Sequence, residues 1–126
     1  MIEVEQVGTT PAVIDVTGLC DLALASAGIE EGHLAVHWVD AERIHELNLE
    51  HRGRDSPTDV LSFPVDEDGP AAGPRELGDV VICPEETEDL PEAVVHGALH
   101  LAGMDHETDD GEMLALQAEI LSWLRE

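Results

Sequence analysis

Three histidines at a fixed spacing constrain the fold of this chain more than any other feature. His96 and His100 are four residues apart, so on a helix their side chains lie on the same face, one turn apart. Gly103 follows where a helix can end in the left-handed conformation, and His106 comes three residues later. The spacing therefore predicts a helix, a reversal at the glycine, and three imidazoles that converge on one point.

A metal ion is the natural occupant of such a point. Three neutral imidazoles leave the fourth position of a tetrahedral zinc ion open to water, as in catalytic rather than structural sites. We therefore predict one zinc ion per chain, bound by His96, His100 and His106, although Ni, Cu, Fe and Co also accept imidazole ligands. The remaining histidines follow no such spacing, and we expect them to be ordinary packed or exposed side chains: His33, His37, His45 and His51.

The same spacing occurs in zinc endopeptidases with a three-histidine site. Those enzymes place Glu directly after the first histidine, where it serves as the general base. This chain has Gly97 at that position, so the usual peptidase base is missing and the sequence argues against proteolysis. Another group must position the water, or the metal ion alone must acidify it.

Hydrophobic periodicity predicts an α+β fold, a mixed α/β layer arrangement. Strand patterns cover residues 2–5, 33–39, 60–65 and 77–83, and helical patterns cover residues 11–27, 41–50, 91–102 and 109–124. Pro64 indicates an edge strand, and turn-forming residues predict loops at 52–59 and 66–75. We expect a single domain spanning residues 1–126, with three to four strands packed against about four helices and the metal site at the end of a helix.

The charge balance is extremely acidic and limits how the chain can meet other molecules. It has 29 acidic and 5 basic residues, for a net charge of −24, which repels anionic partners at low salt. The simplest interpretation is a solvated acidic surface; adaptation to a salty environment, where charges are screened, is the alternative. Aromatic residues make up 2% of the chain, so base stacking on aromatic platforms is largely excluded.

Cysteine usage and hydropathy point to the cytoplasm. Cys20 and Cys83 are too few for a disulfide framework, and we expect two buried, reduced thiols. We see no export signal and no apolar run long enough to span a membrane.

The histidine segment, His96-Gly-Ala-Leu-His-Leu-Ala-Gly-Met-Asp-His106, resembles the HGxLHLxGxDH motif of the YbeY family of bacterial endoribonucleases, also called rRNA maturation factors. A second block, which runs from Arg52 to Pro64 as RGRDSPTDVLSFP, is similar to the family's RGxDxPTDVLSFP. Shorter stretches also agree, and the likeness covers nearly the whole chain in order: ELN at 46–48, GDVVIC at 78–83, ETD at 107–109, LQ at 116–117 and EI at 119–120.

This resemblance implies a single-strand-specific, metal-dependent endoribonuclease that acts in rRNA processing, 16S rRNA 3′ end maturation and ribosome quality control. It implies precursor ribosomal RNA as the substrate, ribosomal proteins as candidate partners, the three histidines as zinc ligands and Arg52 as a residue needed for activity. A guanidinium fork can bind two phosphate oxygens as charge develops in phosphodiester cleavage, although a structural ion pair with a carboxylate is the alternative for Arg52. Asp59 is expected to cap or brace its loop rather than act as a base, and Asp105 either orients His106 or forms a turn.

Three departures from the family pattern bear on the substrate rather than on the fold. The segment of residues 84–95 is shorter than in the family pattern, which predicts a late start of the metal helix and a reduced cleft wall. Met104 stands where the family often has an aromatic residue, and the chain has almost no basic surface. Two other functions therefore stay open. One is a non-catalytic ribosome-assembly factor braced by its metal, and the other is a metal-dependent hydrolase of another substrate, such as a peptide or small ester.

Overall fold

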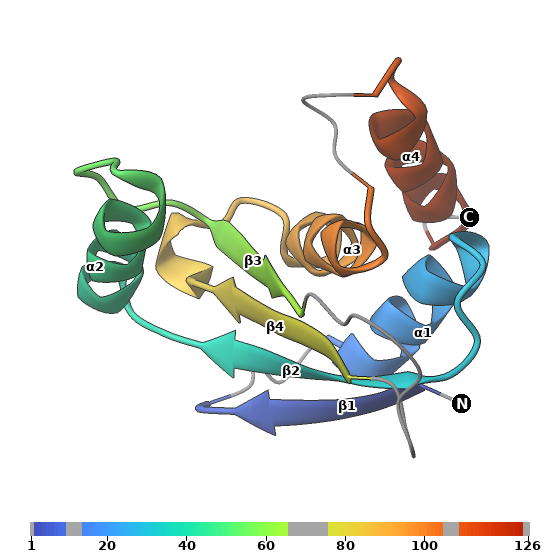
Figure 1. The fold of residues 1–126 in the computed structure, drawn as a ribbon, viewed down its shortest axis with the longest axis horizontal. Helices are drawn as coiled ribbons and strands as arrows, with labels where there is room; N and C mark the ends of the chain where they lie inside the picture. The colour runs from blue at the N-terminus through green and yellow to red at the C-terminus, as the bar shows by residue number, and fades with distance from the viewer. Residues whose placement is uncertain (1, 10–13, 66–75, 105–108, 125–126) are drawn as a thin grey trace.

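A computed structural model describes residues 2–9, 14–65, 76–104 and 109–124. Within these ranges, four strands form one mixed sheet in the order β1-β2-β4-β3 (Figure 1). The sheet is parallel except for β3, which runs antiparallel to β4. As Pro64 predicted, β3 lies at an edge. The strands are β1 (Ile2–Val7), β2 (Gly32–Trp38), β3 (Val60–Pro64) and β4 (Glu76–Ile82).

Four α-helices and one 3-10 turn complete the described fold. They are α1 (Val16–Ser26), α2 (Ala41–Arg52), η1 (Pro84–Glu86), α3 (Leu90–Leu101) and α4 (Glu112–Leu124). The predicted α+β fold is therefore confirmed, because each predicted strand and each predicted helix has a counterpart in the structure. The loop expected at residues 66–75 lies outside the described residues.

Aspartate side chains fix where the helices begin. Oδ1 of Asp40 accepts a hydrogen bond from the Arg43 amide at 2.8 Å, and Asp15 and Asp89 cap α1 and α3 in the same way. Asp109 lies three residues before α4 and so outside the capping position, although its Oδ2 accepts a hydrogen bond from the Met113 amide in the first turn at 3.0 Å. A capping residue lies just outside the helix that it caps. The predicted first helix wrongly included Ile14 and Asp15, because α1 begins at Val16, and its predicted start at residue 11 lies outside the described residues. The predicted start of the last helix at residue 109 was also wrong, because α4 begins at Glu112.

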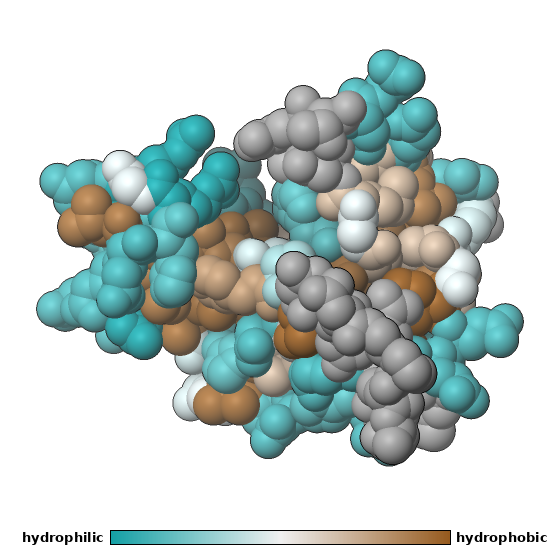
Figure 2. Space-filling view, viewed as in Figure 1, coloured by the Kyte–Doolittle hydropathy of each residue, from teal (hydrophilic) through white to brown (hydrophobic). Residues whose placement is uncertain are grey.

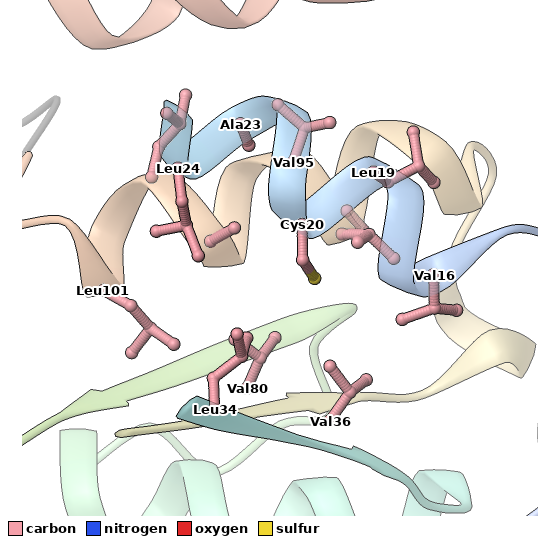
Figure 3. Packing of buried hydrophobic residues seen from close by; sticks show 14 of the residues in the cluster. Val16, Leu19, Cys20, Ala23, Leu24, Leu34, Val36, Val80, Val95 and Leu101 are labelled. Atoms are coloured by element: carbon pink, nitrogen blue, oxygen red, sulfur yellow. The ribbon is translucent and has the colours of Figure 1, made fainter. Parts of the chain in front are cut away.

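The main hydrophobic core lies between the sheet and the layer formed by α1, α3 and α4. Figure 3 shows Cys20 and Leu24 of α1 directed toward Leu34 of β2 and Val80 of β4, with Val95 of α3 beside them. These side chains are almost completely buried. The core is built of aliphatic residues, with Trp38 as its aromatic member among the described residues, as the composition requires.

The opposite face of the sheet is covered by α2 at the β3 and β4 end. Ile44 of α2 packs with Leu61, Val81 and Cys83 in a second, smaller cluster. Since α3 contacts the inner face of β3, the edge strand lies between α2 and α3 (Figure 1). This arrangement brings the end of the second helix near the histidine-bearing helix, although 44 residues separate Arg52 from His96 in the sequence.

Both cysteines are free and buried, as predicted. Among the described residues, no helix combines the length and the apolar character needed to cross a membrane.

Candidate metal centre and cleft

Helix α3 holds two of the three predicted ligands on one face. Its other faces are buried against the sheet and α1, through Val95, Ala98 and Leu99 among others. His96 and His100 are partly exposed, and both line the same cleft. The four-residue spacing therefore places the pair as predicted.

The two imidazoles converge through their Nε2 atoms, which lie 3.2 Å apart. The rings stand at 75° to one another with their centroids 4.7 Å apart. Two nitrogens bound to one tetrahedral zinc ion, each at roughly 2.0–2.1 Å, are about 3.3 Å apart. The observed separation fits two ligands of one cation, and it equally fits a direct N–H···N hydrogen bond between the rings.

Gln117 of α4 supports the same geometry. Its Oε1 lies 2.8 Å from Nδ1 of His96, and the side chain is buried, with 8% exposed. A carbonyl oxygen accepts hydrogen bonds and cannot donate them, so Nδ1 carries the hydrogen. The Nε2 atom of the neutral ring then keeps the lone pair that a metal ion requires.

The predicted reversal after α3 is confirmed at Gly103. Its φ is +94°, and its amide and that of Met104 donate to the last carbonyls of α3, those of His100 and Leu99. The third predicted ligand, His106, lies outside the described residues, as does Asp105. The zinc ligand set of His96, His100 and His106 thus stays a prediction.

A cleft of about 1150 Å³ runs along the edge of the sheet. Its floor is formed by β3, one wall by the end of α2, and the other by the segment before α3 together with α3 and α4. Figure 2 shows hydrophobic side chains over β3, between the hydrophilic surface of α2 and the α3–α4 side. Arg52, His96 and His100 all line this cleft, which brings the predicted catalytic arginine and two of the three predicted metal ligands into one concavity.

The local structure at the end of α2 fixes the position of the Arg52 backbone. This exposed residue is the last of the helix, and Gly53 ends the helix with φ of +69°, a conformation that favours glycine. Asn48, which is buried, donates from Nδ2 to the Ser56 carbonyl at 2.8 Å. The loop that follows Arg52 is therefore tied back to its own helix.

Asp59 braces its loop, as predicted. Its Oδ1 accepts from the Val60 amide at 2.8 Å and from Oγ1 of Thr58 at 3.3 Å. Its backbone carbonyl accepts from the Cys83 amide at 2.9 Å. These contacts fix the start of β3 at the cleft.

The cleft carries more negative than positive charge. Arg52 is the sole arginine among the described residues that line it, whereas five carboxylate residues do so: Asp59, Glu86, Glu88, Asp89 and Glu92. The short segment before α3, which departs from the family pattern, contributes Glu86, Glu88 and Asp89. An anionic substrate must therefore overcome repulsion at one wall.

Three of the four remaining histidines make contacts near the surface, as predicted for residues without a metal spacing. His33 and His37 hydrogen-bond to Glu76 and Asp79 on the sheet. His45 bonds Asp55 at 2.7 Å.

Two cleft residues were missed by sequence reasoning. The His51 ring packs on Phe63 and lines the cleft, and its position directly before Arg52 was the available signal. Gln117 interrupts the apolar face of α4 with a buried amide, beside Met113, Ile120 and Leu121. A polar residue on an apolar helix face needs a hydrogen-bond partner, and that interruption could have identified it.

Comparison with known proteins agrees with the sequence motifs. The family model described as Endoribonuclease YbeY matches residues 12–125. Endoribonuclease YbeY of Rubrobacter xylanophilus is 46% identical over 115 residues, which cover 86% of this chain and 82% of that protein. Endoribonuclease YbeY of Bacillus cytotoxicus is 39% identical over 125 residues, covering 82% of this chain and 80% of that protein.

A solved structure has a similar fold. The solution structure of TM1509 from Thermotoga maritima is 28% identical to this chain, with a TM-score of 0.55. The likeness covers 95% of this chain and 86% of that one, so it extends over the sheet and the helices alike.

Proposed function

Because this chain belongs to the YbeY family of endoribonucleases, we propose that it is a zinc-dependent endoribonuclease that cuts single-stranded precursor ribosomal RNA. The family membership supports the endoribonuclease activity itself. The metal dependence, the single-strand specificity and the roles in 16S rRNA 3′ end maturation and ribosome quality control are the proposed part.

The observation that carries the proposal is the convergence of His96 and His100 in the cleft that Arg52 also lines. Their Nε2 atoms are 3.2 Å apart, as expected of two ligands of one ion. His106, which the motif places three residues after Gly103, is proposed as the third ligand. Three imidazoles would leave one coordination position for solvent.

The protein residues have distinct tasks in this proposal. When bound, the zinc ion supplies Lewis acidity and lowers the pKa of water. Arg52 binds non-bridging phosphate oxygens with its guanidinium fork, which places the scissile phosphate and stabilises the charge that develops on it. The β3 floor, which includes Val60 and Phe63, offers an apolar surface to the sugars and bases of the RNA.

Gly97 follows the first histidine, at the position where zinc endopeptidases carry the glutamate that acts as general base. Gly97 faces β4, where an added Cβ would lie 2.5 Å from Cγ1 of Val80. A glutamate at this position would point into the sheet packing rather than into the cleft. The arrangement therefore supports a nuclease in which zinc and Arg52 carry the electrostatic work.

The test is cleavage of a labelled single-stranded RNA and of the matching duplex by purified protein. We expect cleavage of the single strand, its loss on chelation with recovery on adding Zn²⁺, and its loss in His96→Ala and His100→Ala. His45→Ala removes a histidine that lies outside the cleft lining, so it serves as the matched control. Undiminished cleavage by chelated His96→Ala protein would contradict the proposal.

The same assay separates the two alternatives. A non-catalytic assembly factor would bind ribosomal particles and leave the RNA intact with zinc present. A hydrolase of another class would cleave a peptide or ester in a substrate screen and spare RNA.

A further inference from the structure

A buried amide connects α4 to the candidate metal centre. Among the described residues, Asn48 and Gln117 are the buried polar side chains, and only Gln117 lines the cleft. Burying an amide is costly unless it forms hydrogen bonds. The 2.8 Å contact between Gln117 Oε1 and His96 Nδ1 offsets that cost and joins the final helix to the first histidine of the motif.

The chemistry of this contact selects one form of the His96 ring. A neutral imidazole has one N–H and one lone pair, and the hydrogen bond at one nitrogen decides which form is present. Since Oε1 can only accept, the hydrogen is on Nδ1 and the lone pair is on Nε2. It is Nε2 that lies 3.2 Å from Nε2 of His100.

We propose that Gln117 is a positioning residue, which holds His96 in the Nδ1–H tautomer with Nε2 directed at the zinc position. This inference rests on the proposed function for the identity of the ion, while the tautomer itself does not depend on any metal. Groups that bond the outer nitrogen of a metal-binding histidine typically change metal affinity by about 10–100-fold when removed.

A purely structural role is the competing explanation, because Gln117 also ties α4 to α3. Two substitutions separate the roles. Gln117→Met keeps the length and approximate volume of the side chain but replaces the amide group with a thioether, so that a methyl group takes the place of the accepting oxygen. Gln117→Glu keeps an accepting oxygen at the same position. If Gln117 positions His96, Gln117→Glu should keep the His96 tautomer and the Zn²⁺ affinity, and Gln117→Met should lose both. If Gln117 only ties α4 to α3, the Zn²⁺ affinity of each variant should change in step with its stability.

The first measurement is the tautomer in metal-free wild-type protein, from long-range ¹H–¹⁵N correlations of the histidine rings, with His96 assigned by comparison with His96→Ala. We expect the Nδ1–H pattern for His96 in the wild type and in Gln117→Glu, and its loss in Gln117→Met. An Nε2–H pattern in the wild type would overturn the proposal without reference to any variant.

The second measurement is Zn²⁺ affinity, by competition with a chromophoric chelator, alongside thermal unfolding of each protein. We expect about 10–100-fold weaker binding for Gln117→Met and near wild-type binding for Gln117→Glu. Equal losses of affinity in the two variants, or wild-type affinity in folded Gln117→Met, would overturn the proposal. Failure of the proposed function looks different: wild-type protein would bind Zn²⁺ yet leave RNA uncut, with the tautomer result unchanged.

Discussion

Gly97 of α3 lies against Val80 of β4 so closely that a side chain cannot fit between them. A Cβ on Gly97 would be 2.5 Å from Cγ1 of Val80 and 3.4 Å from Oγ of Ser62. The same Ser62 Oγ donates to the Gly97 carbonyl at 3.2 Å. The histidine helix is therefore seated on the sheet through a glycine, and this seating sets the depth of His96 and His100 in the cleft.

Gly97→Ala should destabilise the protein, although alanine favours helices more than glycine does. Overpacking a core position typically costs about 1–3 kcal/mol, and the helix propensity gain of up to about 1 kcal/mol offsets only part of it. For a domain of this size, each kcal/mol lowers Tm by roughly 3–6 °C. Thermal and urea unfolding of the variant and the wild type would measure the loss.

A double substitution identifies the cause of that loss. Val80→Ala removes both methyl groups that the new Cβ would strike, so Gly97→Ala should cost less in that background than in the wild type. Residues in direct contact give such non-additive changes in unfolding free energy. Additive losses would show that Gly97 is needed for some other reason.

Much of the fold could be predicted because the signals are local. Alternation in residues 33–39 and the helical spacing around His96 follow from backbone geometry alone. Asp40, Gly53 and Gly103 act on their own helix ends, so the sequence near each end is sufficient.

The rest depended on contacts between distant segments. The start of α1 was misjudged because helical spacing continues upstream of Asp15, while the cap decides where the helix begins. Spacing within one helix predicted that His96 and His100 would meet. Arg52 was predicted to belong to the same site only because the sequence resembles the YbeY family. Its place in the cleft depends on α2 and α3 packing on opposite faces of β3, which no local pattern encodes. The same holds for the bond between Gln117 and His96, 21 residues apart.

Arg52→Ala should lower kcat/KM for RNA cleavage by about 10²–10³-fold, because loss of one donor to a developing oxyanion costs that much in other enzymes. Arg52→Lys should recover only part of the loss, since an ammonium group lacks the bidentate fork. Arg43→Ala is the matched control, as Arg43 lies on the same helix but does not line the cleft. If Arg52→Ala cleaves RNA as well as Arg43→Ala does, Arg52 is not needed for cleavage.

The buried thiol of Cys20 should lower the free energy of unfolding at alkaline pH. Burial, with a smaller contribution from the charge of Asp21, raises the pKa of Cys20 to about 12, and its sulfur lies in the core between α1 and the sheet (Figure 3). Above the ordinary thiol pKa of about 8.5, the unfolded chain releases this proton while the folded chain keeps it. The free energy of unfolding should therefore fall as pH rises through 9 to 11, and this one group contributes about 1.4 kcal/mol per pH unit at most.

The composition makes this measurement clean. The chain has no Tyr and no Lys, so Cys20 and Cys83 are the side chains that ionise in that range; burial also raises the pKa of Cys83. Urea unfolding from pH 8 to 11 should give a shallower decline for Cys20→Ala than for the wild type. Identical slopes would contradict the assignment, and rapid alkylation of Cys20 at pH 8 in native protein would do so independently.

RNA cleavage should become more efficient as salt rises from low concentration, opposite to the usual trend. Nucleic-acid-binding proteins normally lose affinity with salt because bound cations are released from the phosphates. Here the net charge of −24 repels the substrate, and the Debye length shrinks from about 30 Å at 0.01 M to about 8 Å at 0.15 M. We expect KM for a fixed single-stranded RNA to fall over this range of KCl.

Glu88→Gln, which removes one charge from the cleft wall, should lower KM at low salt and weaken the salt dependence. Glu30→Gln removes an exposed charge outside the cleft lining and should change KM less. A KM that rises steadily with KCl would mean that phosphate contacts, rather than repulsion by the cleft wall, dominate binding.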